Sequence, residues 1–214
     1  MTDNSKIFDT VATDYDNWFD RNENIFRSEV SALKIAISPH KNGIEIGTGT
    51  GRFAKALKIT IGIEPSENMA KLAQNRGINV VKAYAENLPF YNSSFGFVLF
   101  VTTVCFLNNI EKSFSEAKRI LKPNGAIIIG FIDKNSSLCK EYKNNKSKIF
   151  EKAKFYSAEE LTQLLIKSGF SDFTYLNTLN DSYKNEEIRE PKVCKGLGKR
   201  NFIIIKAIKK LEKW

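Results

Sequence analysis

Apolar residues in the first part of the chain recur at the three- and four-residue spacing of amphipathic helices. One stretch contains Phe8, Val11, Ala12, Tyr15, Trp18 and Phe19, and a second contains Ile25, Phe26, Val30, Leu33 and Ile37. Because Ser38-Pro39 follows directly, we expect two helices within residues 5–38 that end at this dipeptide.

From residue 43 onward, short apolar runs alternate with longer amphipathic stretches, which is typical of βα units that build a parallel sheet. The expected strands are residues 43–47, 60–64, 79–83, 95–101, 126–133, 171–176 and 202–208, and the expected helices are residues 51–57, 66–76, 111–121 and 157–168. The polar, lysine-rich residues 135–154 suit a surface excursion or lid. We therefore predict an α/β fold with a seven-stranded, mostly parallel sheet and helices on both of its faces.

Length and composition narrow the class of protein further. A chain of 214 residues fits one α/β domain with a substantial core. The longest apolar runs, residues 97–104 and 126–132, are shorter than the roughly 20 residues of a membrane span. Residues 1–6 lack the character of a secretory signal, so we expect a cytoplasmic protein without a membrane partner. The cysteines have the spacing of neither a zinc site nor a disulfide framework, and we expect no metal.

The formal net charge of +9 raises the question of an acidic partner such as nucleic acid. The excess is mostly lysine and accompanies abundant asparagine and isoleucine, so compositional bias explains part of it. Nucleic acid stays open as a partner but is not favoured.

The most informative segment, residues 44–53, runs from an apolar strand into three closely spaced glycines and then into a helix. Glycines at Gly47, Gly49 and Gly51 let the backbone turn tightly and let a ligand approach it closely. Their G-x-G-x-G spacing differs from the G-x-G-x-x-G of dinucleotide-binding folds. Glu45, two residues before the first glycine, would repel a pyrophosphate.

A second carboxylate, Glu64, stands at the end of the next expected strand. A carboxylate at that position accepts hydrogen bonds from the hydroxyl groups of a ribose in dinucleotide sites. Together, Glu45 and Glu64 indicate a nucleoside that carries a cationic group instead of phosphates.

Four segments in order resemble the class I S-adenosylmethionine-dependent methyltransferases, within them the broad type 11 group. They are the runs EIGTGTG at residues 45–51, EPS at residues 64–66, AENLPF at residues 85–90 and LKPNG at residues 121–125. The resemblance covers residues 8–170. It implies a Rossmann-like fold, S-adenosyl-L-methionine as the cofactor with S-adenosyl-L-homocysteine as its product, and methyl transfer as the activity.

The resemblance also implies a set of cofactor-binding residues. Glu45 and the glycine loop would hold the methionine part, Glu64 would bind the ribose, and residues 65–66 and 85–86 would border the adenine. The full set is Glu45, Gly47, Thr48, Gly49, Gly51, Glu64, Pro65, Ser66, Ala85, Glu86 and Thr102. Tyr84 stands where the family often has an acidic residue that binds the adenine amino group, so Glu86 or a backbone carbonyl is left for that contact. Gly96 replaces a common aspartate in the fourth strand.

Residues 8–16 resemble the F-D-x-x-A-x-x-Y-D entry of members that act on small molecules. In those members the tyrosine lies over the cofactor site and the helix forms a lid. This implies an N-terminal helical lid in residues 1–40, a cofactor-binding core in residues 41–134, and a substrate-side excursion with a C-terminal helix and strands in residues 135–214. The implied acceptor-pocket residues are Tyr15, Trp18, Phe19 and Thr103. From the residues alone, the three aromatic side chains fit equally well in a packed core.

The sequence assigns no catalytic residue. Methyl transfer depends mainly on placing a nucleophile in line with the sulfonium methyl group and excluding water. His40 lacks partners for hydrolase or metal chemistry, and Cys105 is more simply a small buried apolar residue.

A methyltransferase acting on a small-molecule acceptor is the leading hypothesis, and three alternatives stay open. Lysine-rich residues 134–154 and 192–213 favour an RNA or protein methyltransferase, but no RNA-binding module is recognisable. A non-catalytic S-adenosylmethionine-binding protein would keep the same motifs. A nicotinamide-dependent oxidoreductase rests on fold analogy alone and disagrees with the glycine spacing.

Overall fold

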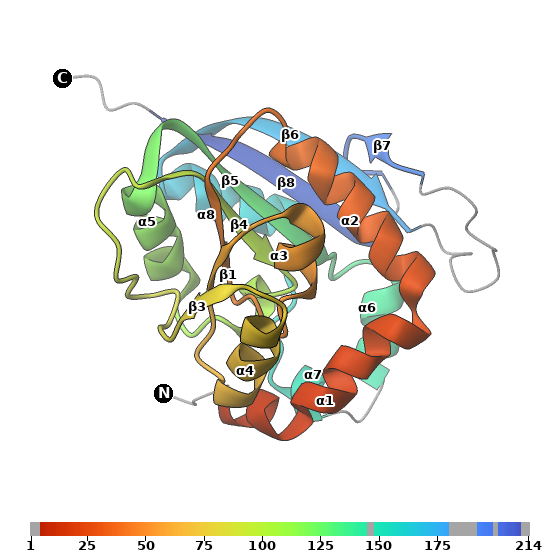
Figure 1. Ribbon diagram of the computed structural model, residues 1–214. Helices are drawn as coiled ribbons and strands as arrows, with labels where there is room; N and C mark the ends of the chain where they lie inside the picture. Colours follow the sequence, from red (N-terminus) through yellow and green to blue (C-terminus); the bar gives the residue numbers. More distant parts are fainter. Residues whose placement is uncertain (1–4, 145–147, 180–191, 199–200, 211–214) are drawn as a thin grey trace.

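The computed structural model describes residues 5–144, 148–179, 192–198 and 201–210, and these build one mixed sheet with helices on both faces (Figure 1). The helices are α1 (Ser5–Arg21), α2 (Glu23–Ile37), α3 (Arg52–Leu57), α4 (Glu67–Asn75), the 3-10 helix η1 (Val104–Phe106), α5 (Ile110–Ile120), α6 (Ser137–Asn144), α7 (Lys148–Glu151) and α8 (Ala158–Lys167). The strands are β1 (Gly43–Ile46), β2 (Ile61–Ile63), β3 (Asn79–Val81), β4 (Phe95–Val101), β5 (Leu121–Ile132), β6 (Phe170–Thr178), β7 (Cys194–Lys195) and β8 (Phe202–Lys209).

The strand order, β3-β2-β1-β4-β5-β8-β6-β7, reverses direction between β1 and β4. β1, β2, β3, β4 and β5 pair in parallel, whereas β8 pairs antiparallel with both β5 and β6. In open sheets of this kind, ligands bind beyond the carboxyl ends of the strands where the order reverses. The topology therefore directs attention to the loops after β1 and β4.

The prediction of seven strands was wrong, because the described residues contain eight. The additional strand is β7, which pairs antiparallel with β6 through Leu176 and Lys195. β7 is only two residues long and lies outside any apolar run, so no hydrophobic periodicity in the sequence indicates it. Its pairing with β6 arises only from the tertiary fold.

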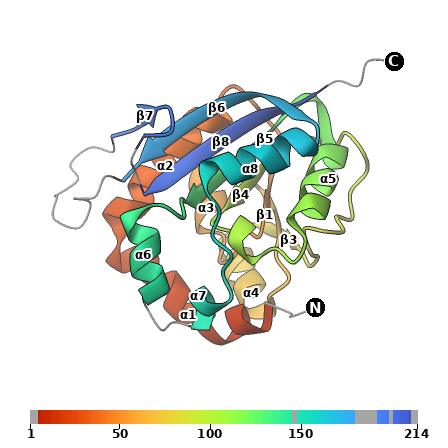
Figure 2. The same ribbon diagram turned by 180° about the vertical axis from the view of Figure 1, so that it is seen from behind.

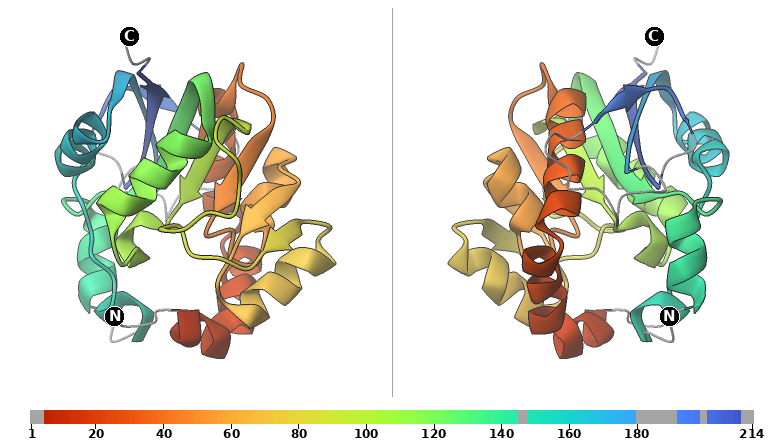
Figure 3. Two further views of the ribbon diagram at one scale, coloured as in Figure 1. Left: turned by 90° about the vertical axis from the view of Figure 1, so that its left-hand side faces the viewer. Right: turned by 90° about the vertical axis from the view of Figure 1, so that its right-hand side faces the viewer.

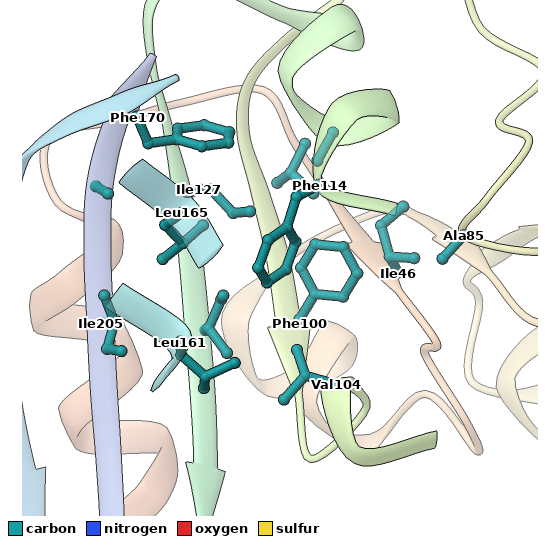
Figure 4. Packing of buried hydrophobic residues seen from close by; sticks show 14 of the residues in the cluster. Ile46, Ala85, Phe100, Val104, Phe114, Ile127, Leu161, Leu165, Phe170 and Ile205 are labelled. Atoms are coloured by element: carbon teal, nitrogen blue, oxygen red, sulfur yellow. The ribbon is translucent and has the colours of Figure 1, made fainter. Parts of the chain in front are cut away.

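Alternation along the strands explains the two-sided core. In β4, Val98 and Phe100 face one layer, and Phe97 and Leu99 face the other. α5 and α8 cover the first layer, where Phe100 and Phe114 meet edge to face with ring centroids 6.2 Å apart (Figure 4). α2, α3 and α4 cover the second layer. α2 and α3 lie in front of the sheet in Figure 1, and α8 lies in front of it in Figure 2.

The start of β5 differs from the expected strand at residue 126. Leu121 already pairs with Phe95, and the next paired residue, Ala126, pairs with Phe97. The residues between them bulge from the ladder, with Asn124 in the left-handed conformation at φ 60°. The expected turn therefore exists as an irregularity inside a longer strand.

The expectation of a surface excursion at residues 135–154 was incomplete, because part of this segment is core. It contains α6 and α7, and Leu138 and Cys139 of α6 are buried. α1, in red, lies with α6 and α7, in blue-green, at the lower end of both views in Figure 3. Within the described ranges, no helix has the length and apolar character needed to cross a bilayer.

Candidate functional site

A cavity of about 500 Å³ opens beyond the carboxyl ends of the parallel strands. One side, here called the loop wall, comes from the loops after β1, β2 and β3: Gly47, Gly49, Glu64, Pro65, Ala83, Tyr84, Ala85 and Glu86. The other, here called the aromatic wall, comes from α1, η1, α6, α7 and the segment before α8: Phe8, Tyr15, Trp18, Phe19, Phe106, Tyr142, Phe150, Phe155 and Tyr156. The volume lies within the range of about 300–1,000 Å³ that is typical of small-molecule sites.

The glycine loop has a backbone that side chains would obstruct. Gly47 has φ 69°, and a Cβ placed on it would lie 2.4 Å from Cγ2 of Thr103. Gly49 has φ 56°, and an added Cβ would meet nothing closer than Cε1 of Tyr15 at 3.8 Å. The first glycine is required by packing, whereas the second leaves its face open toward the cavity.

Glu64 joins the glycine loop to the end of β2. Its Oε2 accepts a hydrogen bond from the Gly49 N–H at 2.8 Å, and its Oε1 accepts one from the Ser66 N–H at 2.9 Å. Burial raises the pKa of this carboxyl group to about 7, although both N–H donors act in the opposite direction. Each oxygen retains acceptor capacity for a further donor such as a ribose hydroxyl. The geometry therefore fits the predicted contact.

Glu45, Thr48 and Gly51 do not line the cavity, although the sequence placed them among the cofactor-binding residues. The Thr48 hydroxyl donates to Oε2 of Glu45 at 2.8 Å, and burial raises the pKa of Glu45 to about 8. A Cβ on Gly51 would lie 2.9 Å from Ala73 of α4, so this glycine permits close packing of α3 on α4. The three residues shape the loop wall from behind.

The residues expected near the adenine divide in the same way. Pro65, Ala85 and Glu86 line the cavity, whereas Ser66 is fully buried behind it and caps α4 by accepting from the Met69 N–H. Oε1 of Glu86 accepts hydrogen bonds from the N–H groups of residues 108 and 109. The Glu86 carboxylate thus fixes the loop before α5.

Thr102 and Thr103 lie at the end of β4, beside the loop wall. Both line the cavity, and Thr102 adopts the left-handed conformation with φ 50°, which is uncommon for a residue with a branched Cβ. Its side chain interacts with the phenol of Tyr15 and lowers the pKa of that group, against the larger effect of burial, which raises it. The Thr103 hydroxyl lies 2.9 Å from the carbonyl oxygen of Val101 and 3.3 Å from that of Gly47. Thr103 therefore fastens the glycine loop as well as facing the cavity.

Tyr15, Trp18 and Phe19 of α1 all line the cavity, so the structure brings the predicted pocket residues together. They also pack on one another, with Phe19 in contact with both Tyr15 and Trp18 at ring-centroid distances of 5.3 and 5.2 Å. Phe19 is buried at 5% exposure and belongs to the core. Phe19 thus lines the cavity and also packs in the core, and its role toward an acceptor stays a prediction.

Three acidic residues, Asp9, Asp16 and Asp20, attach α1 to the elements around the glycine loop, and Asp20 accepts from Arg52 at 2.8 Å. Asp16 accepts from Nε of Arg52, at the start of α3, at 2.9 Å and from Arg76, at the end of α4, at 2.6 Å. Asp9 accepts from the Ser66 hydroxyl at 2.7 Å and from the N–H of residue 68 at 3.0 Å. Burial opposes ionisation of Asp16, but hydrogen bonds from Arg52 and other groups lower its pKa to about 2. These contacts fix α1 across the cavity.

Comparisons with known proteins bear on what such a cavity does. Residues 44–129 match the methyltransferase domain family. A protein of Methanocaldococcus jannaschii is 44% identical over 205 residues, which span 95% of this chain and 98% of that protein. A solved structure from Thermotoga maritima, described as a SAM-dependent methyltransferase and possible histamine N-methyltransferase, is 43% identical. It covers 97% of this chain and 100% of its own, with a TM-score of 0.91.

The chain belongs to the S-adenosylmethionine-dependent methyltransferases.

The cofactor of this methyltransferase is therefore S-adenosylmethionine. A phosphoethanolamine N-methyltransferase of Haemonchus contortus, solved in complex with S-adenosyl-L-methionine, shares the fold at a TM-score of 0.66. Its sequence identity to the methyltransferase is 18%, over 95% of this chain and 57% of that chain. At this identity the likeness shows the fold alone.

Sequence reasoning missed three charged residues that line the cavity of this methyltransferase: the exposed Asp14 and Arg21 of α1, and the buried Glu29 of α2. Glu29 is only 4% exposed. A signal was present, because Glu29 stands at helical spacing from the buried residues Ala32, Leu33 and Ala36. A glutamate on the apolar stripe of an amphipathic helix points toward the interior.

In the part of the methyltransferase that the structure describes, no side chain stands out as a nucleophile or metal ligand. Burial raises the pKa of the Cys105 thiol to about 12, and a thiol, unlike a thiolate, is a poor nucleophile. His40 does not line the cavity. Among the described residues, no group of three or more His, Cys, Asp or Glu side chains is arranged to hold a metal ion.

Proposed function

We propose that this methyltransferase transfers the methyl group of S-adenosylmethionine to a small molecule held within the cavity. The observation that carries the proposal is that the loop wall and the aromatic wall enclose one cavity. An acceptor that sits against the aromatic wall therefore shares a desolvated space with a cofactor on the loop wall. The description of the Thermotoga maritima relative also names a small acceptor, histamine.

The loop wall supplies the contacts for the cofactor in this proposal. Glu64 accepts the ribose hydroxyls with its remaining lone pairs while the N–H groups of Gly49 and Ser66 hold the carboxylate in place. The open face of Gly49 admits the methionine part, and Pro65 and Ala85 border the adenine. When bound, S-adenosylmethionine supplies an activated methyl group on a cationic sulfur.

The chain contributes orientation and exclusion of water to the reaction. The rings of the aromatic wall displace water and restrict the acceptor to one side of the cofactor. Thr102 and Thr103 stand between the two walls, at the end of β4. No described side chain is needed as a nucleophile, because the acceptor itself attacks the methyl group.

α1 acts as a lid in this proposal. It contributes Phe8, Tyr15, Trp18 and Phe19 to the aromatic wall, and Asp9 and Asp16 fasten it to the elements of the loop wall. Hydrogen–deuterium exchange of residues 5–21 should slow when S-adenosylhomocysteine binds. Unchanged exchange on saturation would mean that α1 is a fixed wall and not a lid.

The experiment that tests the proposed function has two steps. Isothermal titration calorimetry with S-adenosylhomocysteine establishes cofactor binding, and release of S-adenosylhomocysteine from S-adenosylmethionine then reports turnover. Small amines, phenols and carboxylic acids are compared with total RNA and with protein extract. Turnover only with RNA, with a steep dependence on salt concentration, would contradict a small-molecule acceptor.

A further inference from the structure

A carboxyl group that pairs with none of the described residues lines the cavity. Glu29 of α2 is 4% exposed, and no residue in the described ranges makes a hydrogen bond or ion pair with it. Burying a carboxylate without a partner costs several kcal/mol by order of magnitude, so such a group either holds a proton or is compensated by a ligand. Glu29 can therefore exchange its proton for the charge of a bound cation.

The surroundings of Glu29 favour a cation as that ligand. Among the described residues that line the cavity, the acidic ones are Asp14, Glu29, Glu64 and Glu86 and the basic one is Arg21; Asp14 and Arg21 are both exposed. The cavity is thus acidic although the whole chain has a net charge of +9. Aromatic rings, which attract cations through their faces, form much of the remaining wall.

The pKa values of Glu29 and Tyr15 reflect the burial of both side chains. Burial alone raises the pKa of Glu29 to about 8, and Arg21 makes no contribution to the shift. Glu29 in turn raises the pKa of Tyr15, for which burial is the larger cause, so the two groups lie close enough to interact. Tyr15 and Glu29 both line the cavity, and Cε1 of Tyr15 lies 3.8 Å from the position of a Cβ on Gly49.

We propose that the acceptor of this methyltransferase carries a basic amine, and that the Glu29 carboxylate binds its ammonium group within the aromatic wall. The proposal rests on the proposed function and specifies the substrate class of the same cavity. Because the cofactor is itself a cation, the test separates a contact with the acceptor from one with the cofactor.

The test uses the full chain saturated with S-adenosylhomocysteine and two probes of the same shape, 2-phenylethylamine and 2-phenylethanol. Calorimetry measures the dissociation constant of each probe for the wild type, for Glu29→Gln and for Glu23→Gln. Glu23 is an exposed residue of the same helix and gives the matched control. The Gln side chain keeps the size of Glu29 and removes its charge.

We expect the wild type to bind the amine at least about tenfold more tightly than the alcohol, since hydrogen bonds to charged groups are the stronger ones. Glu29→Gln should remove this preference, leave the alcohol within about twofold, and leave S-adenosylhomocysteine within about twofold. Glu23→Gln should change none of the three. The wild-type comparison does not depend on how well a variant folds.

Three results would overturn the proposal while leaving the proposed function intact. They are equal binding of the two probes, no binding of either probe to the S-adenosylhomocysteine complex, and a loss of S-adenosylhomocysteine affinity in Glu29→Gln. The last would assign Glu29 to the cofactor. Failure of the wild type to bind S-adenosylhomocysteine would instead contradict the proposed function itself.

Discussion

The loop wall and the aromatic wall are built in different ways. The loop wall follows directly on three parallel strands, and backbone N–H groups such as those of Gly49 and Ser66 set its shape through Glu64. The aromatic wall collects side chains from α1, η1, α6, α7 and the segment before α8. Shape in the first wall depends on the backbone, whereas in the second it depends on which side chain stands at each position. We therefore expect changes in the loop wall to abolish cofactor binding and changes in the aromatic wall to alter acceptor selection.

The largest effect is expected from Glu64→Ala, which removes the carboxylate that holds the loop wall together. Two backbone N–H groups lose their acceptor, and the proposed ribose contact is lost. Truncating a buried, hydrogen-bonded charged group costs about 2–5 kcal/mol, so the affinity for S-adenosylhomocysteine should fall at least about 30-fold. Calorimetry measures this, with Glu67→Ala as control, because Glu67 is exposed on the neighbouring turn. Equal affinity of the two variants would remove Glu64 from the cofactor site.

A second substitution in the loop wall separates the energetic cost of backbone strain from the cost of a steric clash. Gly47→Ala places a Cβ 2.4 Å from Thr103 at φ 69°, whereas Gly77→Ala places one in open space at φ 84°. Strain alone should cost Gly77→Ala about 1–2 kcal/mol of unfolding free energy. In Gly47→Ala the steric clash with Thr103 adds to this strain, so the total loss of unfolding free energy should be about 2–4 kcal/mol. Urea denaturation checks both values, and equal losses would show that Thr103 moves aside at no cost.

The same contrast decides how much of the molecule could be predicted from its sequence. Residues 44–53 and Glu64 were recognisable as parts of a cofactor site from the sequence alone. The apolar strand and the glycines of the turn are consecutive in the chain, so no contact between distant residues is needed to identify them. The structure places the carboxylate and the glycine loop in direct contact. What the sequence could not indicate is that Glu45 and Gly51 stand behind the wall, since burial against α3 and α4 depends on packing between elements.

The aromatic wall was predictable only in part. Tyr15, Trp18 and Phe19 share one helix, so a single motif located them together, although it did not distinguish pocket from core. Tyr142 and Phe150 lie in a lysine-rich segment whose average polarity hides them, and they reach the cavity only because α6 and α7 fold beside α1. Glu29 was overlooked because a glutamate in an amphipathic helix is ordinarily a surface residue.

Two buried carboxyl groups, one in the cavity and one behind the loop wall, should both make the protein less stable as the pH rises. Burial raises the pKa of Glu29, in the cavity beside Tyr15, and of Glu45, behind the loop wall beside Glu64, to about 8. The folded protein thus holds these protons more tightly than the unfolded chain, whose glutamates titrate near 4.5. Their contribution to stability is complete below about pH 4.5 and is lost as the pH rises toward 8.

As the pH rises from 6.5 to 8.5, ionisation of each of these two carboxyl groups should lower the free energy of unfolding by about 2 kcal/mol, at 1.36 kcal/mol per pKa unit. Glu29→Gln and Glu45→Gln should each flatten the pH dependence, which urea denaturation at several pH values measures. Glu64, whose pKa burial raises to about 7, adds a smaller slope of the same sign within this window, whereas the ionisation of Asp16, with its pKa of about 2, lies outside it. A flat wild-type profile would mean that neither carboxyl group is buried in the protonated form. A slope removed by Glu45→Gln alone would mean that the Glu29 side of the cavity is hydrated.

The smallest effect is expected from Tyr15→Phe, which keeps the ring in the aromatic wall and removes only the hydroxyl. Loss of the buried hydroxyl and of its polar interaction with the Thr102 side chain should cost about 0.5–1.5 kcal/mol of unfolding free energy, and Tyr91→Phe, at a side chain that is 91% exposed, gives the control. Because the ring beside Gly49 is retained, affinity for S-adenosylhomocysteine should stay within about threefold. A loss as large as that of Glu64→Ala would instead show that the Tyr15 phenol binds the cofactor directly. Tyr15 would then belong functionally to the loop wall, and the division of the cavity would fall between Tyr15 and Trp18.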